Sequence, residues 1–282
     1  MEKCPFCASH SRLYVEVFGD ALFKCSACGL VFLSPYPDRQ EMIRRHQTED
    51  YANHPYFKAG EEIAEKEGLE LHHFLLTLLK SRLPSTARIL DVGAGSGDFL
   101  SLAAPHFQVS GVEPSPYLAE RIEKRVGCPV FVGAFEDYQD SMGFDAVVLI
   151  DIIEHTADPR QLLQKAFDTL RPGGLLVVCT VDSNALLYHL GPLVWRLSGS
   201  VSQAKYILQR IFCYQHNWYF NRNVLKGVIQ QAGFSILEHK GYEFPLNRLQ
   251  ESFIIVSGLR MLYLVQKILG SNTEQYLLAQ KK

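Results

Sequence analysis

A glycine-rich turn follows a short apolar segment in the first half of the chain. Residues 88–92 (Arg-Ile-Leu-Asp-Val) run directly into Gly93–Gly97, whose sequence is Gly-Ala-Gly-Ser-Gly. Glycine adopts positive φ angles without strain and lets the backbone approach a ligand closely. Such a turn needs a strand before it and a helix after it. The turn alone does not identify the ligand, because dinucleotide-binding proteins have a similar glycine-rich turn.

Apolar segments alternate with amphipathic ones on either side of this turn. Near-continuous apolar runs predict strands buried on both faces, and apolar stripes at three- and four-residue steps predict helices. This alternation is typical of an α/β, Rossmann-like fold, in which helices cover both faces of a parallel sheet. Arg171–Gly174 (Arg-Pro-Gly-Gly) is expected to end one helix as a turn. The expected strands are 88–92, 107–112, 130–132, 146–150, 175–180, 234–238 and 275–279, and the expected helices are 97–104, 116–126, 162–170 and 223–231.

Two apolar segments in the C-terminal half do not fit this alternation. Residues 184–215 lack strand periodicity, and residues 246–270 carry apolar side chains at helical steps with charges between them. We therefore predict an α/β domain over residues 86–282 with helical insertions at these two places. The competing interpretation takes 253–256 as the last strand.

Two carboxylates next to the glycine turn indicate which ligand it holds. Asp91 ends the strand before the turn, where its side chain could receive the ammonium group of an amino-acid ligand and would repel a pyrophosphate. Glu113 ends the next strand and is placed to accept hydrogen bonds from both hydroxyls of a ribose. This pair favours S-adenosylmethionine. The alternative is that the glycines serve the turn geometry alone and Asp91 caps the helix.

Four segments in order resemble the motifs of class I S-adenosylmethionine-dependent methyltransferases. They are 91–97, 111–115, 144–155 and 170–174, and the third contains the Glu-His pair of ubiquinone-type O-methyltransferases. The resemblance implies a seven-stranded sheet whose last strand is antiparallel and lies between two others. The implied cofactor-binding residues are Asp91, Gly93, Ala94, Gly95, Gly97, Glu113, Pro114, Phe135, Glu136 and Asp151.

The adenine side departs from the family pattern. Many relatives carry an acidic residue directly after the third strand, whereas Ala134 follows Gly133 here. Glu136 or Asp137 could substitute, or backbone groups around Phe135 could hold the adenine.

Methyl transfer from a sulfonium is an in-line displacement that depends mainly on placing acceptor and methyl group together. A general base is needed where a hydroxyl acceptor must lose a proton. Asp151, Glu154 and His155 follow the fourth strand, and His216 lies in an aromatic segment near residue 218. These four are the candidate catalytic residues. Each histidine has a structural alternative, as a packed helix residue or as a residue that orders a loop.

Two Cys-x-x-Cys pairs near the N-terminus, Cys4 with Cys7 and Cys25 with Cys28, predict a zinc site. Four thiolates leave no open coordination position, so the zinc would be structural. A redox dithiol and a rubredoxin-type iron site are the alternatives. Many bacterial methyltransferases of natural-product and surface-polysaccharide clusters begin with a similar ribbon. We assign residues 1–36 to the ribbon and 37–85 to a helical linker or cap.

The formal net charge of −2 offers no reason to expect a nucleic-acid partner. No secretory pattern or convincing membrane span is seen, so we expect a cytoplasmic protein. The expected activity is methylation, by preference O-methylation, of a small-molecule, lipid-linked or sugar-linked acceptor. An apolar cap would also suit peripheral membrane contact or a homodimer interface. The alternatives are a zinc-ribbon binding module with an inactive methyltransferase-like domain, and a nucleotide-dependent oxidoreductase.

Overall fold

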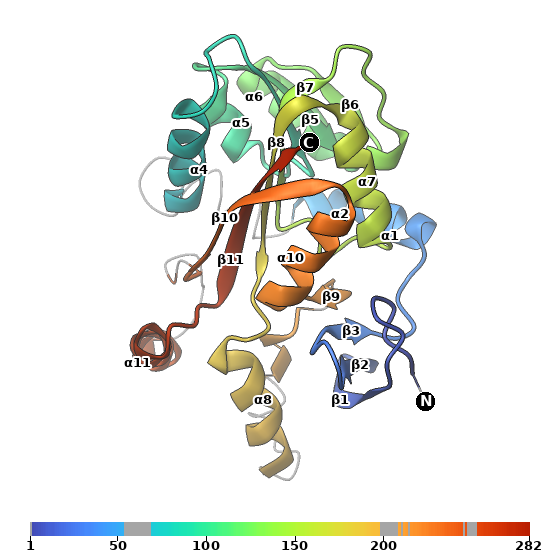
Figure 1. The fold of residues 1–282 in the computed structure, drawn as a ribbon, viewed down its shortest axis with the longest axis vertical. Coiled ribbons are helices and arrows are strands. Elements are labelled where there is room, and N and C mark those ends of the chain that lie inside the picture. The colour runs from blue at the N-terminus through green and yellow to red at the C-terminus, as the bar shows by residue number, and fades with distance from the viewer. Residues whose placement is uncertain are drawn as a thin grey trace.

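The computed structural model describes residues 2–53, 69–197, 208–209, 211–213, 215–244, 246 and 253–282. Within these residues the chain forms two β-sheets, one of seven strands and one of four (Figure 1). The large sheet has the strand order β10-β11-β8-β7-β4-β5-β6, and the small sheet has the order β1-β2-β3-β9.

The seven-stranded sheet confirms the fold predicted from the sequence. Its β4, β5, β6, β7 and β8 pair in parallel, whereas β11 runs antiparallel to both β8 and β10. The last strand therefore lies between two others, as the family resemblance implied. The strands are β4 (Arg88–Val92), β5 (Gln108–Glu113), β6 (Val130–Val132), β7 (Phe144–Ile150), β8 (Leu170–Val181), β10 (Phe234–Tyr242) and β11 (Glu274–Lys281).

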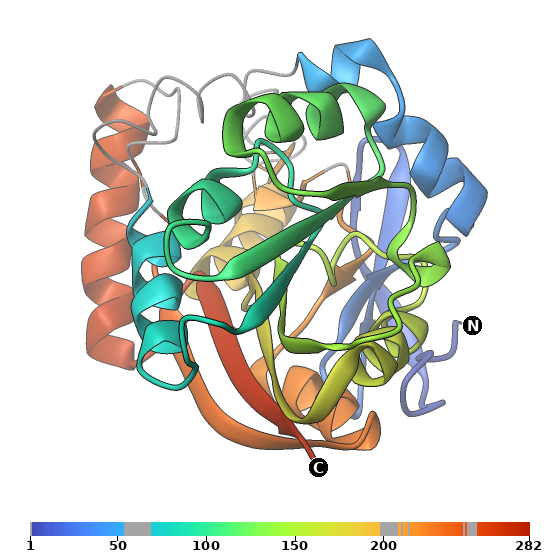
Figure 2. The same ribbon diagram turned by 90° about the horizontal axis from the view of Figure 1, so that it is seen from above.

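Helices cover both faces of this sheet, which explains why its strands read as continuous apolar runs (Figure 2). One apolar core joins the sheet to α7 and α10, and a second joins the opposite face to α4, α5 and α6. The central strands are shielded from solvent, since Leu149, Leu176 and Leu277 are fully buried. The helices are α4 (Glu70–Lys80), α5 (Asp98–Ala103), α6 (Pro116–Val126), α7 (Pro159–Thr169) and α10 (Arg222–Gln231).

One strand boundary differs from the prediction. Arg171–Gly174 was expected as a turn, but β8 begins at Leu170 and includes these residues. Leu170 pairs with Phe144, and the register with β7 shifts before Leu175 pairs with Ala146. The glycines therefore form an irregularity inside the strand, which local turn propensity alone does not distinguish from a loop.

The helical insertions are present where the structure describes them. Helix α8 (Leu186–Leu197) follows β8, and helix α11 (Phe253–Leu269) precedes β11. Residues 253–256 are thus helical, so the competing assignment of the last strand to this segment is wrong. Residues 198–207, 210, 214, 245 and 247–252 lie outside the described part. No helix among the described residues is long and apolar enough to cross a bilayer.

Short helices follow the N-terminal sheet. Helices α1 (Arg39–His46) and α2 (Glu49–Ala52) lead toward α6, where the Arg121 guanidinium donates to the Ala52 carbonyl at 2.9 Å. Residues 54–68, part of the expected linker, lie outside the described residues.

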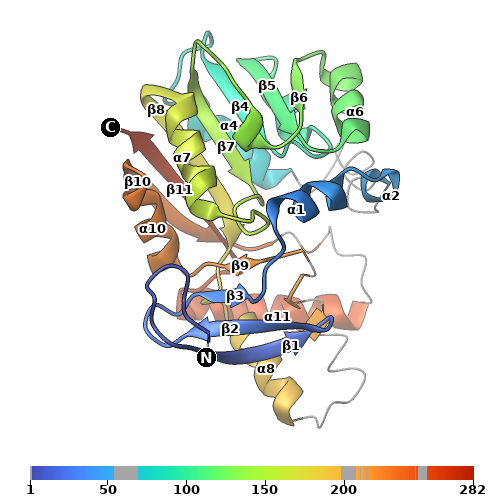
Figure 3. The same ribbon diagram turned by 90° about the vertical axis from the view of Figure 1, so that its right-hand side faces the viewer.

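The N-terminal sheet takes its fourth strand from the C-terminal half of the chain. Strands β1 (Ser11–Val17), β2 (Asp20–Cys25) and β3 (Val31–Leu33) form an antiparallel meander, and β9 (Trp218–Tyr219) pairs with β3. Figure 3 shows this sheet beneath the large one, with β9 leading from it toward the large sheet. A two-residue strand has no periodicity, so this pairing could not be predicted from sequence patterns.

Candidate active site

The turn after β4 has the geometry that only glycine adopts without strain. Gly93, Gly95 and Gly97 have φ angles of +69°, +54° and +76°. A Cβ at Gly93 would lie 2.1 Å from the Cδ1 atom of Ile152, so even alanine would clash there. The Gly93 amide donates to the Val112 carbonyl at 2.7 Å and ties the turn to β5. The turn therefore brings bare backbone to the carboxyl end of the sheet, where α/β folds bind ligands.

Glu113 closes this turn from the neighbouring strand. Its buried carboxylate accepts hydrogen bonds from the amides of Gly95, at 2.8 Å, and Ser115, at 2.9 Å. Burial raises the pKa of Glu113 to about 7, although the two backbone hydrogen bonds oppose the shift. Each oxygen accepts one amide and retains lone-pair capacity for a ribose hydroxyl. The predicted ribose contact thus fits the geometry, and Pro114 follows directly in the chain.

Asp91 is the second buried carboxylate at this edge of the sheet, with a residue exposure of 3%. Burial raises its pKa well above the usual range, and the neighbouring charges of Glu113 and Asp98 raise it further. A ligand ammonium group would stabilise the ionised form of such a carboxyl. The two carboxylates, Asp91 and Glu113, therefore fit the ammonium group and the ribose hydroxyls of S-adenosylmethionine.

The residues considered for adenine lie on a short helix after β6. Phe135 is buried at the start of this helix, η1 (Phe135–Asp137). Arg39 from α1 lies 3.8 Å from the Glu136 carboxylate and also pairs with Asp137. One guanidinium thus engages both acids, and the adenine contact of Phe135 or Glu136 stays a prediction.

The chain turns sharply after β7. Asp151 has a φ of +54°, a conformation that costs a non-glycine residue about 1–3 kcal/mol and that recurs at functional sites. Its amide donates to the Cys179 carbonyl at 3.0 Å, which fixes the turn to β8. Glu154, three residues later, is 1% exposed, and its carboxylate has no hydrogen-bond partner of standard geometry among the described residues. Burial raises the pKa of Glu154, and the Asp151 charge adds to the shift.

The structure brings His155 and His216 together from distant parts of the chain. Their ring centroids are 4.6 Å apart in an edge-to-face arrangement. The Nδ1 atom of His155 lies 3.0 Å from the Gln215 carbonyl. Burial lowers the pKa of His155 to about 4 and that of His216 well below its ordinary value, so both rings are neutral at pH 7. One ligand atom each from Glu154, His155 and His216 lie within 4.8 Å of one another, a set that can hold a proton or a metal ion.

Two further residues of this site were not predicted from the sequence. The Asn217 amide group donates to the carbonyls of His155, at 3.2 Å, and Thr156, at 3.3 Å. The indole of Trp218 donates to the Thr156 carbonyl at 2.7 Å. The sequence signal was the presence of two polar residues, Gln215 and Asn217, within an otherwise aromatic segment.

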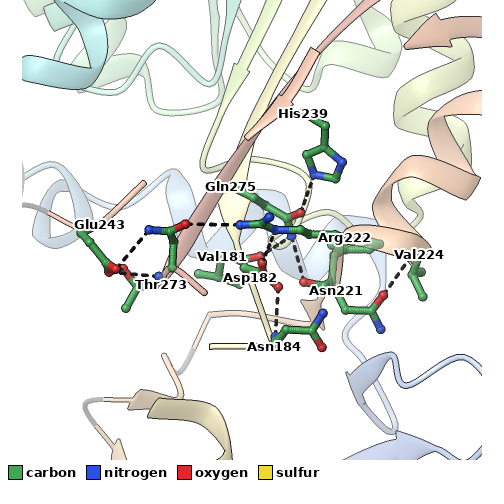
Figure 4. Close-up of polar contacts among 12 residues, drawn as sticks. Val181, Asp182, Asn184, Asn221, Arg222, Val224, His239, Glu243, Thr273 and Gln275 are labelled. Carbon is green, nitrogen blue, oxygen red and sulfur yellow. Dashed lines mark hydrogen bonds and ion pairs between the residues drawn. The ribbon is translucent and has the colours of Figure 1, made fainter. Parts of the chain in front are cut away.

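A polar network joins the end of β8 to the starts of β11 and α10 (Figure 4). Asp182 pairs with Arg222 at 2.9 Å, and the fully buried Gln275 donates to the Val181 and Phe220 carbonyls. The network anchors the segment that follows β9 to the large sheet.

The four N-terminal cysteines form one cluster. The Sγ atoms of Cys4 and Cys28 are 3.6 Å apart, those of Cys7 and Cys25 are 3.4 Å apart, and all four lie within 4.8 Å of one another. Tetrahedral zinc with Zn–S bonds of about 2.3 Å separates its sulfurs by about 3.8 Å. The cysteines thus fit a zinc ion, which would cross-link the two knuckles, and none of the four is joined in a disulfide.

Fold and site together define a class I S-adenosylmethionine-dependent methyltransferase. A family profile described as a methyltransferase domain matches residues 63–239, more than half of the chain. The chain belongs to this family of methyltransferase domains.

Curated relatives agree with this class. A ubiquinone biosynthesis O-methyltransferase of Dinoroseobacter shibae is 25% identical over 177 residues, covering 57% of this chain and 65% of the relative. One of Xanthomonas axonopodis pv. citri is 31% identical over 124 residues, covering 41% of this chain and 52% of the relative. The chain thus spans between about half and two thirds of the length of these relatives.

Solved structures share the fold. A SAM-dependent methyltransferase from Thermotoga maritima has a TM-score of 0.50 and 23% identity, covering 81% of this chain and 99% of that chain. Phosphoethanolamine N-methyltransferase 2 of Haemonchus contortus, in complex with S-adenosyl-L-methionine, has a TM-score of 0.58 and 18% identity, covering 89% and 61%. The [4+2]-cyclase SpnF also shares it, with a TM-score of 0.52 and 16% identity, covering 74% and 80%. The fold alone therefore does not define the reaction, which depends on the residues of the site.

Glu113→Gln should lower the affinity for the cofactor and make that affinity less dependent on pH. Because the pKa of Glu113 is about 7, the wild-type carboxyl is ionised above this pH and gains a proton below it, which removes acceptor capacity. Affinity for S-adenosylhomocysteine should therefore fall as the pH drops through about 7, and the raised pKa of Asp91 acts in the same direction. The variant should bind about 1–3 kcal/mol more weakly at pH 8, with a smaller pH dependence, by calorimetry. The exposed Glu120→Gln is the control. Wild-type affinity in Glu113→Gln would remove the ribose assignment.

Cys25→Ser should lose the metal and retain the cofactor. We expect one zinc per chain in reduced wild-type protein and a much lower content in the variant, measured by elemental analysis. Affinity for S-adenosylhomocysteine should stay within about twofold, since Asp91 and Glu113 lie on the other sheet. Cys128→Ser, outside the cluster, is the matched control. Wild-type protein without metal would contradict the zinc assignment.

Proposed function

We propose that this protein transfers the methyl group of S-adenosylmethionine to a hydroxyl group of a small-molecule, lipid-linked or sugar-linked acceptor. The observation that carries the proposal is the convergence of Glu154, His155 and His216 at the carboxyl end of the sheet, beside the proposed cofactor site. A hydroxyl acceptor needs a group that takes its proton, and this cluster offers two neutral imidazoles. The O-methyltransferase names of the curated relatives support the same chemistry.

His155 is the better candidate for the base. Its Nδ1 atom faces the Gln215 carbonyl and so carries the proton, which leaves the Nε2 lone pair to accept one. The Nδ1 atom of His216 has no hydrogen-bond partner among the described residues, so its tautomer is not fixed in this way. Bound S-adenosylmethionine would supply an activated methyl group. His155 would receive the acceptor proton, and the Asn217 contact to its carbonyl would hold the backbone in place.

The two inserted helices, α8 and α11, carry exposed apolar side chains. Leu193 and Leu197 on α8, and Leu264 and Ile268 on α11, are exposed by 50%, 78%, 61% and 85%. Neither helix contains an acidic residue. This surface supports an apolar or lipid-linked acceptor reached at a membrane surface, and a homodimer interface would use the same face. A cytoplasmic location belongs to the same proposal.

His155→Asn separates base catalysis from positioning. The asparagine amide can still donate to the Gln215 carbonyl but offers nothing at the position of Nε2. A base with a pKa of about 4 has little driving force, so we expect a rate loss of about 10²-fold, the lower end of the usual range. Affinity for S-adenosylhomocysteine should be unchanged. A rate equal to that of the wild type would assign His155 to positioning alone.

Partition of a labelled product tests the acceptor type. Methyl-labelled S-adenosylmethionine is incubated with the protein and with either 3,4-dihydroxybenzoate or a lipid and small-molecule extract of bacterial cells. O-methylated phenols and lipids should pass from acidified solution into an organic solvent, O-methylated sugars should stay in water at every pH, and N-methylated amines should stay in acid and extract only at alkaline pH. Label recovered only in the amine fraction would overturn O-methylation. Without transfer or stabilisation by S-adenosylhomocysteine, the zinc-ribbon binding module would be the better interpretation.

A further inference from the structure

The ribbon, defined here as residues 2–36, contacts the methyltransferase domain at several places, and one of them is the short segment Asn217–Asn221, which adjoins the turn that carries His155. Strand β3 pairs with β9 through Val31 with Tyr219 and Phe32 with Trp218. The Leu33 amide donates to the Asn217 carbonyl at 2.9 Å. The edge of the ribbon sheet is thus completed by backbone of the domain.

Both cysteine knuckles contact the same segment. In the first knuckle, the ring of Phe6 meets Trp218 edge-on at 5.8 Å and Phe220 at 6.0 Å. In the second, the Cys28 carbonyl accepts the Asn221 side-chain amide at 2.8 Å, and Asn221 also caps α10. Three separate parts of the ribbon therefore hold one stretch of five residues.

Arg160, on α7, binds the first knuckle from the other side. Its guanidinium donates to the carbonyls of Pro5, at 3.0 Å, and Phe6, at 3.1 Å, and lies 4.6 Å from the centre of the Phe6 ring. Phe6 is thereby held between Arg160 and the aromatic side chains of the segment.

The opposite side of the segment contacts the turn that carries the proposed base. The Glu154 carbonyl accepts the amides of Asn217, at 2.8 Å, and Trp218, at 3.2 Å. The two side chains donate to the carbonyls of His155 and Thr156. The peptide between Asn217 and Trp218 is therefore fixed by β3 on one side and by the Glu154–Thr156 turn on the other, directly after His216.

We infer that the ribbon is a positioning element of the acceptor side, in which Phe6 and Arg160 hold Asn217–Asn221 so that His216 stays against Glu154 and His155. The inference rests on the proposed function for its catalytic consequence. The structural part of the inference does not depend on the proposed function, because it concerns only how firmly the segment Asn217–Asn221 is held in place. Phe6 and Arg160 are positioning residues that act through Trp218. Zinc bound by the cysteines would keep Phe6 in place.

Amide exchange in Phe6→Ala and Arg160→Ala tests the inference in the full-length protein. Neither change removes a cysteine. Peptides containing Asn217 and Trp218 should exchange about tenfold faster than in the wild type, whereas those containing Val92 and Val112 should be unchanged. Zinc content should remain one per chain, and affinity for S-adenosylhomocysteine should stay within about twofold. Methyl transfer to the extractable product should fall in parallel with the loss of protection.

Two further variants make the outcome decisive. Phe6→Tyr keeps the aromatic contact and should restore protection and transfer, and Leu13→Ala, an exposed position on β1, should change neither. Unchanged exchange at Asn217 and Trp218, equal acceleration at Val92, or failure of Phe6→Tyr to restore protection would overturn the inference. If the wild type transfers no methyl group, the proposed function fails while the exchange measurements still decide the positioning role.

Discussion

The buried carboxylate of Glu113 is the constraint around which the cofactor half is arranged. A carboxylate removed from water must be hydrogen-bonded or lose its charge, and Glu113 meets this requirement with the amides of Gly95 and Ser115. These bonds connect the glycine turn after β4 with the start of α6. A side chain at Gly93 or Gly97 would collide with Ile152 or Ile122, and it would also be strained by the positive φ angle. The glycines and the Glu113 carboxylate thus stabilise the same turn together.

The acceptor half depends instead on a single peptide. The amides of Asn217 and Trp218 both point to the Glu154 carbonyl, and the Asn217 carbonyl accepts the Leu33 amide. The ribbon, the Glu154–Thr156 turn and the start of α10 meet there, although they are far apart in sequence. The large sheet therefore carries both the proposed cofactor residues and the turn with the candidate base, and the small sheet contacts the segment packed against that turn.

The elements set by local periodicity were predictable, and those set by long-range pairing were not. The strand over 88–92, the helix over 116–126 and the antiparallel last strand followed from apolar spacing and family motifs, and the structure confirms them. The proximity of His155 and His216 depends on β9, whose two residues form a strand only because β3 is already there. Sequence patterns identified both histidines as candidates but carried no information about their contact. The roles of the site residues stay predictions.

Strand β11 follows every other described strand in the sequence, yet it lies between β8 and β10. Until a ribosome has delivered residues 274–281, the edge of β8 presents unpaired backbone groups, and β10 has no described neighbour in the large sheet. The nascent chain can assemble the cofactor turn from β4, β5 and β7 earlier, because β4 pairs with both β5 and β7. The order of synthesis thus allows the glycine turn to form first. The seven-stranded sheet can be completed only when β11 is available to pair with β8 and β10.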